Sequence, residues 1–212
     1  MKEETPKSKC LMCKKEYTDK GIQKHIKNCL PKHIKQAAKG KAKQFWYLVV
    51  KTPFPSPFFL HLLLSETATL LDLDKYLRQT WLECCGHLSS FSKEPIGDDI
   101  DFNKKIKSVF IPGTTLYHQY DFGTTTELTV TCIDLYEGSS GSNKIKLLSQ
   151  NAIPIVTCNE CNKKSAVEIC TQCVYNGKGF LCEDCAKDHE CGEDMFLPFV
   201  NSPRTGVCGY TG

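Results

Sequence analysis

Long hydrophobic runs are missing from this sequence of 212 residues. The longest apolar stretches, at 45–50 and at 58–64 with His61 inside, are much shorter than the roughly 18 residues that a membrane span needs. Residues 1–44 also lack the apolar core of about 7–15 residues that a secretory signal carries. We therefore expect a cytoplasmic protein without a membrane partner.

Catalytic signatures are equally scarce. The sequence has no phosphate-binding glycine loop, no paired carboxylates and no nucleophile motif. The tripeptide 121–123 reads Asp-Phe-Gly, but the glycine-rich loop and the His-Arg-Asp segment that accompany it in kinases are missing. We expect Tyr120 and Phe122 to pack on opposite sides of a strand end, with Asp121 and Gly123 in the turn. These absences favour a protein that is not an enzyme.

Cysteine, by contrast, is abundant, with 14 residues. In a reducing compartment, Cys-x2-Cys pairs are metal ligands more often than disulfide partners. The hydrophobic fraction of 41% is still sufficient for a core. The composition therefore predicts a folded protein that also binds metal.

The first ligand set lies in residues 1–31, which we expect to form a zinc finger. Two cysteines on a hairpin precede a histidine and a cysteine spaced i and i+4 on one helix face, so that all four reach one ion. The pattern resembles small zinc fingers of the Cys-Cys-His-Cys kind. The predicted ligands are Cys10, Cys13, His25 and Cys29, with Tyr17 and Ile22 as core fillers.

Positive charge is concentrated at the same end. Residues 1–44 carry a net charge of +9, whereas residues 45–212 carry −6. Lysines on one face of the finger helix and along the basic linker 32–44 can follow a phosphate backbone without reading its sequence. The alternative is that they only solvate the finger. The candidate nucleic-acid contacts are Lys14, Lys15, Lys20, Lys24, Lys27, Lys32, Lys35, Lys39, Lys41 and Lys43.

The central segment, 45–151, is predicted to be an α+β domain. Short apolar runs and alternating segments indicate a mostly antiparallel sheet, and apolar residues at helical spacing indicate one packed core helix. Leu70, Leu73, Leu77 and Trp81 form the buried face of that helix, which Gly86 ends. The expected helix covers 68–85, and the expected strands cover 45–52, 58–65, 105–111, 115–120, 127–136 and 144–148.

Part of this segment is similar to a known family, the plasmid-encoded ORF-three proteins, also described as insertion-element passenger TnpR-like proteins. The matching residues are Leu70, Leu73, Trp81, His87, Leu88, Phe91, Gly113 and 117–123, and the closing segment 201–210 looks like the tail of zinc-bearing members. After Asp-Phe-Gly, common members have an acidic residue, a tryptophan and a histidine, whereas this chain has 124–127 Thr-Thr-Thr-Glu. The resemblance implies a fold, and a link to mobile elements, more than an activity.

The last segment, 152–212, holds two further ligand sets. Eight donors in a short stretch suffice for two closed tetrahedral sites, as in B-box and related cross-brace domains, where the first and third pairs share one ion. A sequential pairing fits nearly as well, and Cys208 is an alternative to the eighth ligand. The donors are Cys158, Cys161, Cys170, Cys173, Cys182, Cys185, His189 and Cys191.

Three cysteines have no place in these sets. Cys132 fits a buried strand position, whereas Cys84 and Cys85 end the core helix near His87, where a nucleophile lacks a third, orienting group. We therefore expect a non-enzymatic adaptor with three zinc ions that binds nucleic acid through its N-terminal arm and a protein through its C-terminal domain. The alternatives are a module that binds only proteins, or an enzyme with a pocket near His87, His118 and Asp121.

Overall fold

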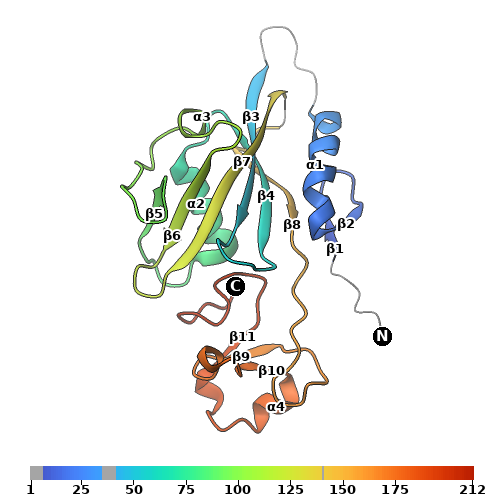
Figure 1. Cartoon of the computed structure of the whole chain (residues 1–212), viewed down its shortest axis with the longest axis vertical. Helices are drawn as coiled ribbons and strands as arrows, with labels where there is room; N and C mark the ends of the chain where they lie inside the picture. The colour runs from blue at the N-terminus through green and yellow to red at the C-terminus, as the bar shows by residue number, and fades with distance from the viewer. Residues whose placement is uncertain (1–6, 35–41, 140) are drawn as a thin grey trace. The chain divides into compact units, whose positions relative to one another are not determined.

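The computed structural model describes residues 7–34, 42–139 and 141–212. These residues form two compact units, and the chain crosses between them three times (Figure 1). The first unit comprises Met1–Leu77 and Leu88–Ala152, and the second comprises Arg78–His87 and Ile153–Gly212. In the described part of the chain, no helix combines the length and apolarity needed to cross a membrane.

The first unit is built on a six-stranded sheet. Its strand order is β5-β6-β7-β3-β4-β8, and every neighbouring pair is antiparallel. The sequence predicts a mostly antiparallel sheet with one packed helix for this segment, and the strand pairing agrees with that sheet. The strands are β3 (Lys43–Lys51), β4 (Phe59–Ser65), β5 (Ser89–Ser92), β6 (Thr115–Tyr120), β7 (Thr126–Gly138) and β8 (Ile145–Gln150).

Both faces of the central strands are covered, which explains why β3 and β4 are continuous apolar runs rather than alternating ones. On one face lies the helix α2 (Leu70–Leu77), whose Asp74 is 2.9 Å from Nε2 of His118 on β6. On the same face Trp46 donates from Nε1 to the carbonyl of Phe110, at 2.9 Å. Leu73 and Leu77 of α2 are buried as predicted.

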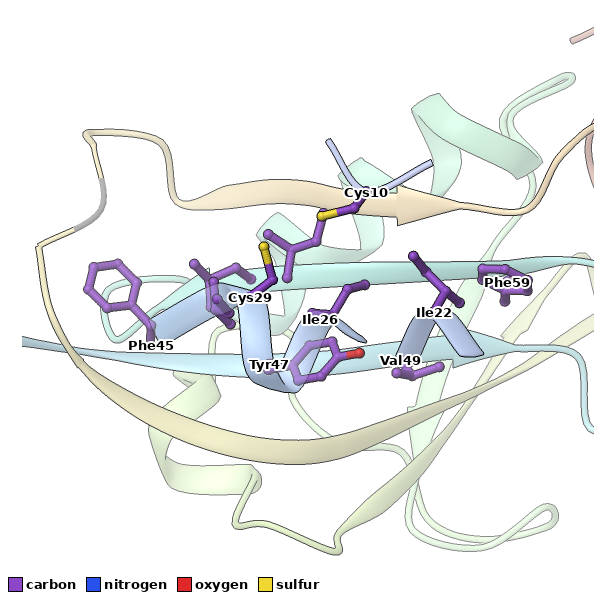
Figure 2. Close-up of a cluster of buried hydrophobic side chains, with 11 residues drawn as sticks. Cys10, Ile22, Ile26, Cys29, Phe45, Tyr47, Val49 and Phe59 are labelled. Carbon is purple, nitrogen blue, oxygen red and sulfur yellow. The ribbon is translucent and has the colours of Figure 1, made fainter. Parts of the chain in front are cut away.

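The opposite face is covered by the N-terminal segment, which contains β1 (Lys7–Lys9), β2 (Glu16–Thr18) and α1 (Asp19–His33). Figure 2 shows Ile22 and Ile26 of α1 packed over Tyr47 and Val49 of β3. Backbone contacts support this packing, because the amide of Leu11 donates to the carbonyl of Leu148 on β8 at 2.8 Å. The expected finger at 1–31 is therefore, in its described part, a layer of the first unit rather than a separate body.

Three local expectations for the first unit differ from the structure. The strand expected at 105–111 is instead the short helix α3 (Ile106–Val109). The helix expected over 68–85 is shorter in the structure: the α-helix ends at Leu77 and is followed by a π-helical turn, Arg78–Leu82. Strand β5 was not predicted, since its four residues carry three serines and a single apolar side chain, Phe91. Serine-rich, short edge strands give no periodic signal.

The second unit contains little regular structure. Its sheet has three short antiparallel strands, in the order β10 (Phe180–Leu181), β9 (Glu168–Cys170) and β11 (Phe196–Pro198). One short helix, α4 (Glu183–Lys187), follows β10. The core cluster around this sheet consists mainly of cysteines, with Leu181 and Ala186 as its buried apolar additions. An apolar core this small points to another source of stability.

Candidate metal centres

Four groups of cysteine and histidine side chains gather their donor atoms within 4.8 Å in the described residues. Every cysteine of the chain except Cys132 belongs to one of them. The first group, in the first unit, is Cys10, Cys13, His25 and Cys29. The second unit holds the other three groups: Cys158, Cys161, Cys182 and Cys185; Cys170, Cys173, His189 and Cys191; and Cys84, Cys85, His87 and Cys208.

The distances between donors fit a single tetrahedral ion. Metal–sulfur bonds of about 2.3 Å and metal–nitrogen bonds of about 2.0 Å place the donors of such a site about 3.5 to 3.8 Å apart. The Sγ atoms of Cys161 and Cys182 are 3.8 Å apart, and Sγ of Cys173 is 3.5 Å from Nε2 of His189. A disulfide would need sulfurs about 2.05 Å apart. These clusters can hold metal ions.

The first centre is built from a tight turn and a helix. The turn after Cys10 closes when the amide of Lys14 donates to the carbonyl of Cys10 at 2.8 Å, with Lys14 at a φ of 66°. His25, on α1, brings Nε2 to 3.3 Å from Sγ of Cys13. Its ring stacks on that of Tyr17, with centroids 3.9 Å apart, so the predicted filler also fixes the orientation of the ligand.

The eight donors of the last segment group in the cross-braced manner. The first pair, Cys158 and Cys161, meets the third pair, whereas the second pair meets His189 and Cys191. The turn at Cys158 repeats that at Cys10, because the amide of Asn162 donates to the carbonyl of Cys158 at 3.1 Å and Asn162 has a φ of 53°. Of the two arrangements left open by the spacing, the structure has the crossed one, with Cys191 in the eighth position.

Backbone amides favour the thiolate form of two of these cysteines, Cys158 and Cys170. Burial alone would raise the pKa of the Cys158 thiol, but amides that point at its sulfur, including those of Cys161 and Cys182, lower that pKa to about 6. The Cys170 thiol has a pKa of about 7, because the amides of Cys173 and Gln172 outweigh its burial. Thiolates are the form of cysteine that binds metal.

A carboxylate orients the histidine of the same domain. Oε1 of Glu160 lies 2.6 Å from Nδ1 of His189, and this contact raises the pKa of the imidazole. With Nδ1 engaged by Glu160, Nε2 is left to face Cys173. Metal-bound histidines commonly have such a carboxylate partner, which fixes the ring and its tautomer. Glu160 was not predicted as a partner of His189, since nothing in the spacing distinguishes it from other surface acids.

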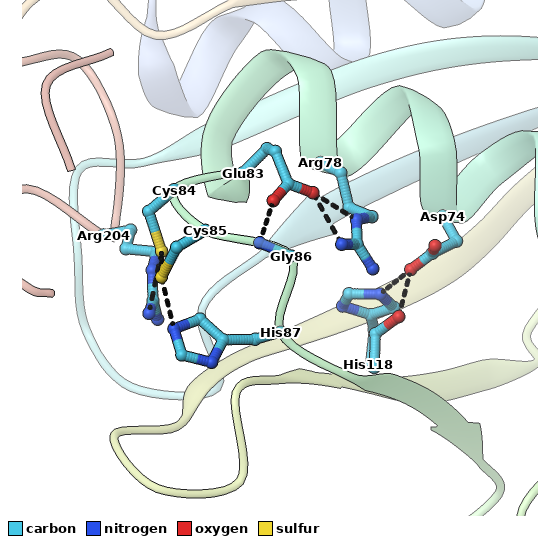
Figure 3. Close-up of polar contacts among 10 residues, drawn as sticks. Asp74, Arg78, Glu83, Cys84, Cys85, Gly86, His87, His118 and Arg204 are labelled. Carbon is cyan, nitrogen blue, oxygen red and sulfur yellow. Dashed lines mark hydrogen bonds and ion pairs between the residues drawn. The ribbon is translucent and has the colours of Figure 1, made fainter. Parts of the chain in front are cut away.

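The fourth group was not predicted as a metal site. Figure 3 shows Cys84, Cys85 and His87 together with Arg204. Sγ of Cys208, from the closing turn, lies 3.7 Å from Sγ of Cys85 and 3.2 Å from Nε2 of His87. Cys208 thus joins this group and not the set containing His189. The only available signal was partial elimination, since Cys84, Cys85 and Cys208 had no assigned set, but neither did Cys132 or four of the six histidines.

The described lysines among the predicted nucleic-acid contacts are all exposed, namely Lys14, Lys15, Lys20, Lys24, Lys27, Lys32 and Lys43. Lys35, Lys39 and Lys41 lie outside the described residues. Of the described lysines, Lys20, Lys24 and Lys27 line a groove of about 630 Å³, together with Lys51 of β3. Lys51 is not among the predicted contacts, and it joins the helix lysines because α1 lies on the sheet.

The groove is predominantly cationic. Its floor includes His61, and burial lowers the pKa of this imidazole to about 3, so the ring is neutral near pH 7. The one carboxylate in the lining is Asp19, whose Oδ1 accepts a hydrogen bond from Ser8 at 2.8 Å. Lys27 also forms an ion pair of 3.4 Å with Asp134. Lys20, Lys24 and Lys51 therefore carry the positive charge that faces an incoming ligand.

The three residues of the suspected enzyme pocket have separate partners. His118 is fully buried and pairs with Asp74. Asp121 accepts hydrogen bonds from the amides of Gly123 and Thr124, as expected for a turn residue. His87 lies with Cys85 and Cys208 in the second unit. These contacts do not form a nucleophile, base and orienting group.

Cys132 is buried on its strand as expected. Burial raises the pKa of its thiol to about 11, which keeps it protonated near neutral pH and therefore unreactive.

Comparison with known proteins adds little to this geometry. No family model matches the chain, and no curated protein matches it. Among solved structures, the chain is similar to the crystal structure of a protein of unknown function, MM3350 from Methanosarcina mazei Go1, with 18% sequence identity and a TM-score of 0.42. The match covers 50% of this chain and 67% of that one.

Proposed function

We propose that this protein is a non-enzymatic adaptor whose zinc-bound first centre carries a nucleic-acid-binding surface. The supporting observation is the groove lined by Lys20, Lys24 and Lys51, none of which pairs with a carboxylate in the described part of the chain. Cations on a rigid scaffold bind phosphates without reading base sequence. Membership of the ORF-three family, and with it a link to mobile elements, stays a prediction from the residues.

Zinc is the metal that suits the donors. The first centre and the His189 set each offer three thiolates and one imidazole, and the Cys158 set offers four thiolates. Zinc accepts both sets in tetrahedral geometry, and four protein ligands leave no position for a catalytic water. We therefore assign these three ions a structural role: the first one holds α1 and its lysines against the turn of Cys10 and Cys13.

The proposal is tested by salt-dependent binding of the full chain to a labelled DNA duplex, a single-stranded DNA and an RNA hairpin. Each phosphate contact adds about 0.7 to 0.9 to the slope of log affinity against log salt. Replacing Lys20, Lys24 and Lys51 by glutamine should therefore lower that slope by about 2 to 3. The matched control replaces three exposed lysines of another surface, Lys104, Lys105 and Lys107, and removes the same charge.

Two results would contradict the proposal: no binding to any of the three probes at low salt, or equal loss in the lysine variant and in its control. The comparison of probes also identifies the ligand. A shared affinity for all three indicates backbone recognition, whereas a preference for one of them indicates recognition of shape.

A second candidate function is supported by the second unit. Glu168, Glu183 and Glu193 line a groove of about 740 Å³ together with Phe196 and Leu197. Lys187 lines it as well and pairs with Glu183 at 3.3 Å, so the acidic side chains still outnumber the basic one. Acidic side chains around apolar ones suit a basic, partly apolar peptide. If nucleic acid does not bind, partner capture by the nuclease-treated full chain, lost when Glu183 and Glu193 become glutamine, would support an adaptor that binds only proteins.

A further inference from the structure

We infer that Cys84, Cys85, His87 and Cys208 form a fourth zinc site, in addition to the three that the proposed function uses. All four residues belong to the second unit. Their donor atoms lie within 4.8 Å of one another, as do those of the other three groups. The site would join the segment that follows α2 to the closing turn of the chain.

The sulfur separations are those of ligands on one ion. Sγ of Cys85 is 3.6 Å from Sγ of Cys84 and 3.7 Å from Sγ of Cys208. Nε2 of His87 is 3.0 Å from Sγ of Cys85 and 3.2 Å from Sγ of Cys208. A tetrahedral zinc site requires sulfurs about 3.8 Å apart, and a disulfide requires about 2.05 Å. The donors thus gather around one point, with the His87 nitrogen closer to the sulfurs than the roughly 3.5 Å of a filled tetrahedral site, and no two sulfurs are bonded.

Local hydrogen bonds shape the segment that carries three of the donors. Oε1 of Glu83 accepts a hydrogen bond from the amide of Gly86 at 2.6 Å, and its other oxygen accepts one from Nε of Arg78 at 2.6 Å. Gly86 has a φ of 77°, a conformation that side chains disfavour. The bend at Cys84 and Cys85, followed by this conformation at Gly86, leaves Sγ of Cys85 and Nε2 of His87 3.0 Å apart.

The fourth donor is positioned by an equally specific turn. Ser202 donates from Oγ to the carbonyl of Trp81 at 2.6 Å, which fastens the closing segment to the π-helical turn. Cys208 itself has a φ of 49°. A non-glycine residue in this left-handed conformation costs free energy and persists where surrounding contacts compensate. Binding of a metal by the Cys208 thiolate supplies such compensation.

Charge provides an independent argument. The side chain of Arg204 is completely buried, and its Nη2 lies 3.4 Å from Sγ of Cys84. A buried guanidinium needs nearby negative charge. A zinc ion with three thiolates and one neutral imidazole leaves one excess negative charge, and Arg204 lies where it offsets that charge. Arg204 is thus a positioning residue that stabilises the thiolate of Cys84.

The test counts zinc in the intact chain by native mass spectrometry, after purification under reducing conditions with zinc present. We expect four ions in the natural chain and three in Cys208→Ser. His87→Ala should also bind three, and so should the double variant, because both residues serve one site. The matched control is Cys132→Ala, which removes the one cysteine outside the four groups and should keep four ions.

A natural chain that binds three ions contradicts the inference, and so does a count of four that Cys208→Ser leaves unchanged. If Cys208→Ser drops below three, the serine has also unfolded the cross-braced sites, and cobalt titration of the natural chain then decides. Thiolate-to-cobalt absorption that saturates at four equivalents supports the fourth site, and saturation at three rejects it. The nucleic-acid assays above do not depend on either outcome, so the two proposals fail separately.

Discussion

The two units use cysteine in different ways. In the first unit, Cys10 and Cys29 sit at the edge of an apolar cluster that also contains Ile22, Ile26 and Tyr47. In the second unit, cysteines make up most of the cluster itself. Metal binding therefore adds one layer to a sheet that has its own core in the first unit, whereas in the second unit it holds together a cluster with few apolar side chains.

Removal of metal should have the largest effect, and it should affect the stability of the two units differently. Structural zinc contributes about 10–16 kcal/mol in small zinc domains, so a chelator should unfold the second unit and leave the sheet of the first unit folded. Each unit contains one tryptophan, Trp46 in the first and Trp81 in the second, and both are buried. In Trp46→Phe, chelation should shift the remaining emission to the red. In Trp81→Phe the emission should stay nearly unchanged, and an equal shift in both variants would show that the sheet also depends on metal.

Removal of an apolar contact, in contrast, should destabilise the first unit. Ile26 is fully buried between α1 and the sheet, so Ile26→Ala should lower the free energy of unfolding of the first unit by about 2–5 kcal/mol. Urea unfolding followed through Trp46, in the Trp81→Phe background, measures this loss. Lys24→Ala, on the exposed side of the same helix, is the control and should cost less than about 0.5 kcal/mol.

Backbone crowding distinguishes two glycines of the second unit. A Cβ at Gly179 would lie 2.5 Å from the amide nitrogen of Val174 and 2.7 Å from the carbonyl oxygen of Cys170. Gly179→Ala should thus destabilise the unit by about 1–3 kcal/mol and weaken zinc binding by the His189 set. Gly177 has a φ of 72° but open space around it, so Gly177→Ala should cost about 1 kcal/mol. Urea unfolding followed through Trp81 compares them, and equal losses would contradict the crowding argument.

The smallest effect concerns pH. Burial, with a lesser contribution from Lys51, lowers the pKa of His61 from 6.5 to about 3. The unfolded chain then binds the extra proton between these two values, so stability is complete above pH 6.5 and falls as the pH drops toward 3. The loss for this one group is at most about 1.4 kcal/mol per pH unit. His61→Asn should show a shallower decline between pH 7 and pH 5.5, and parallel declines would exclude His61 as the cause.

The sequence predicted these two units unevenly. The periodic segments of the sheet were sufficient for five of its six strands, all but β5, and the spacing of Cys158 to Cys191 was sufficient for the donors. Ligand spacing could not decide the crossed pairing, because both pairings place two Cys-x2-Cys pairs at similar intervals. The packing of α1 on the sheet could not be predicted either. Ile26 and Leu30 could form the core of a separate finger or an apolar face that packs against another element.

The fourth group shows the limit of local patterns most clearly. The sequence predicts that Cys84 and Cys85 end the core helix, and adjacent side chains point in different directions on a regular helix. In the structure α2 ends before Cys84 and Cys85, and Gly86 has a positive φ. The two thiols can therefore face the same point, which they could not do on a helix. Cys208 lies 123 positions after Cys85, so only the folded chain brings them together.

The division of the second unit along the chain also affects its biosynthesis. Trp81 and His87 leave the ribosome long before their partners, since Cys208 follows His87 by 121 residues. At a synthesis rate of about 5–20 residues per second, Cys208 is added roughly 6 to 24 seconds after His87. During that interval the strands from β5 to β8 are synthesised and can complete their sheet. A nascent chain of this protein therefore passes through a stage in which one unit is finished and three unsatisfied donors are exposed to the metal and thiol pools around it.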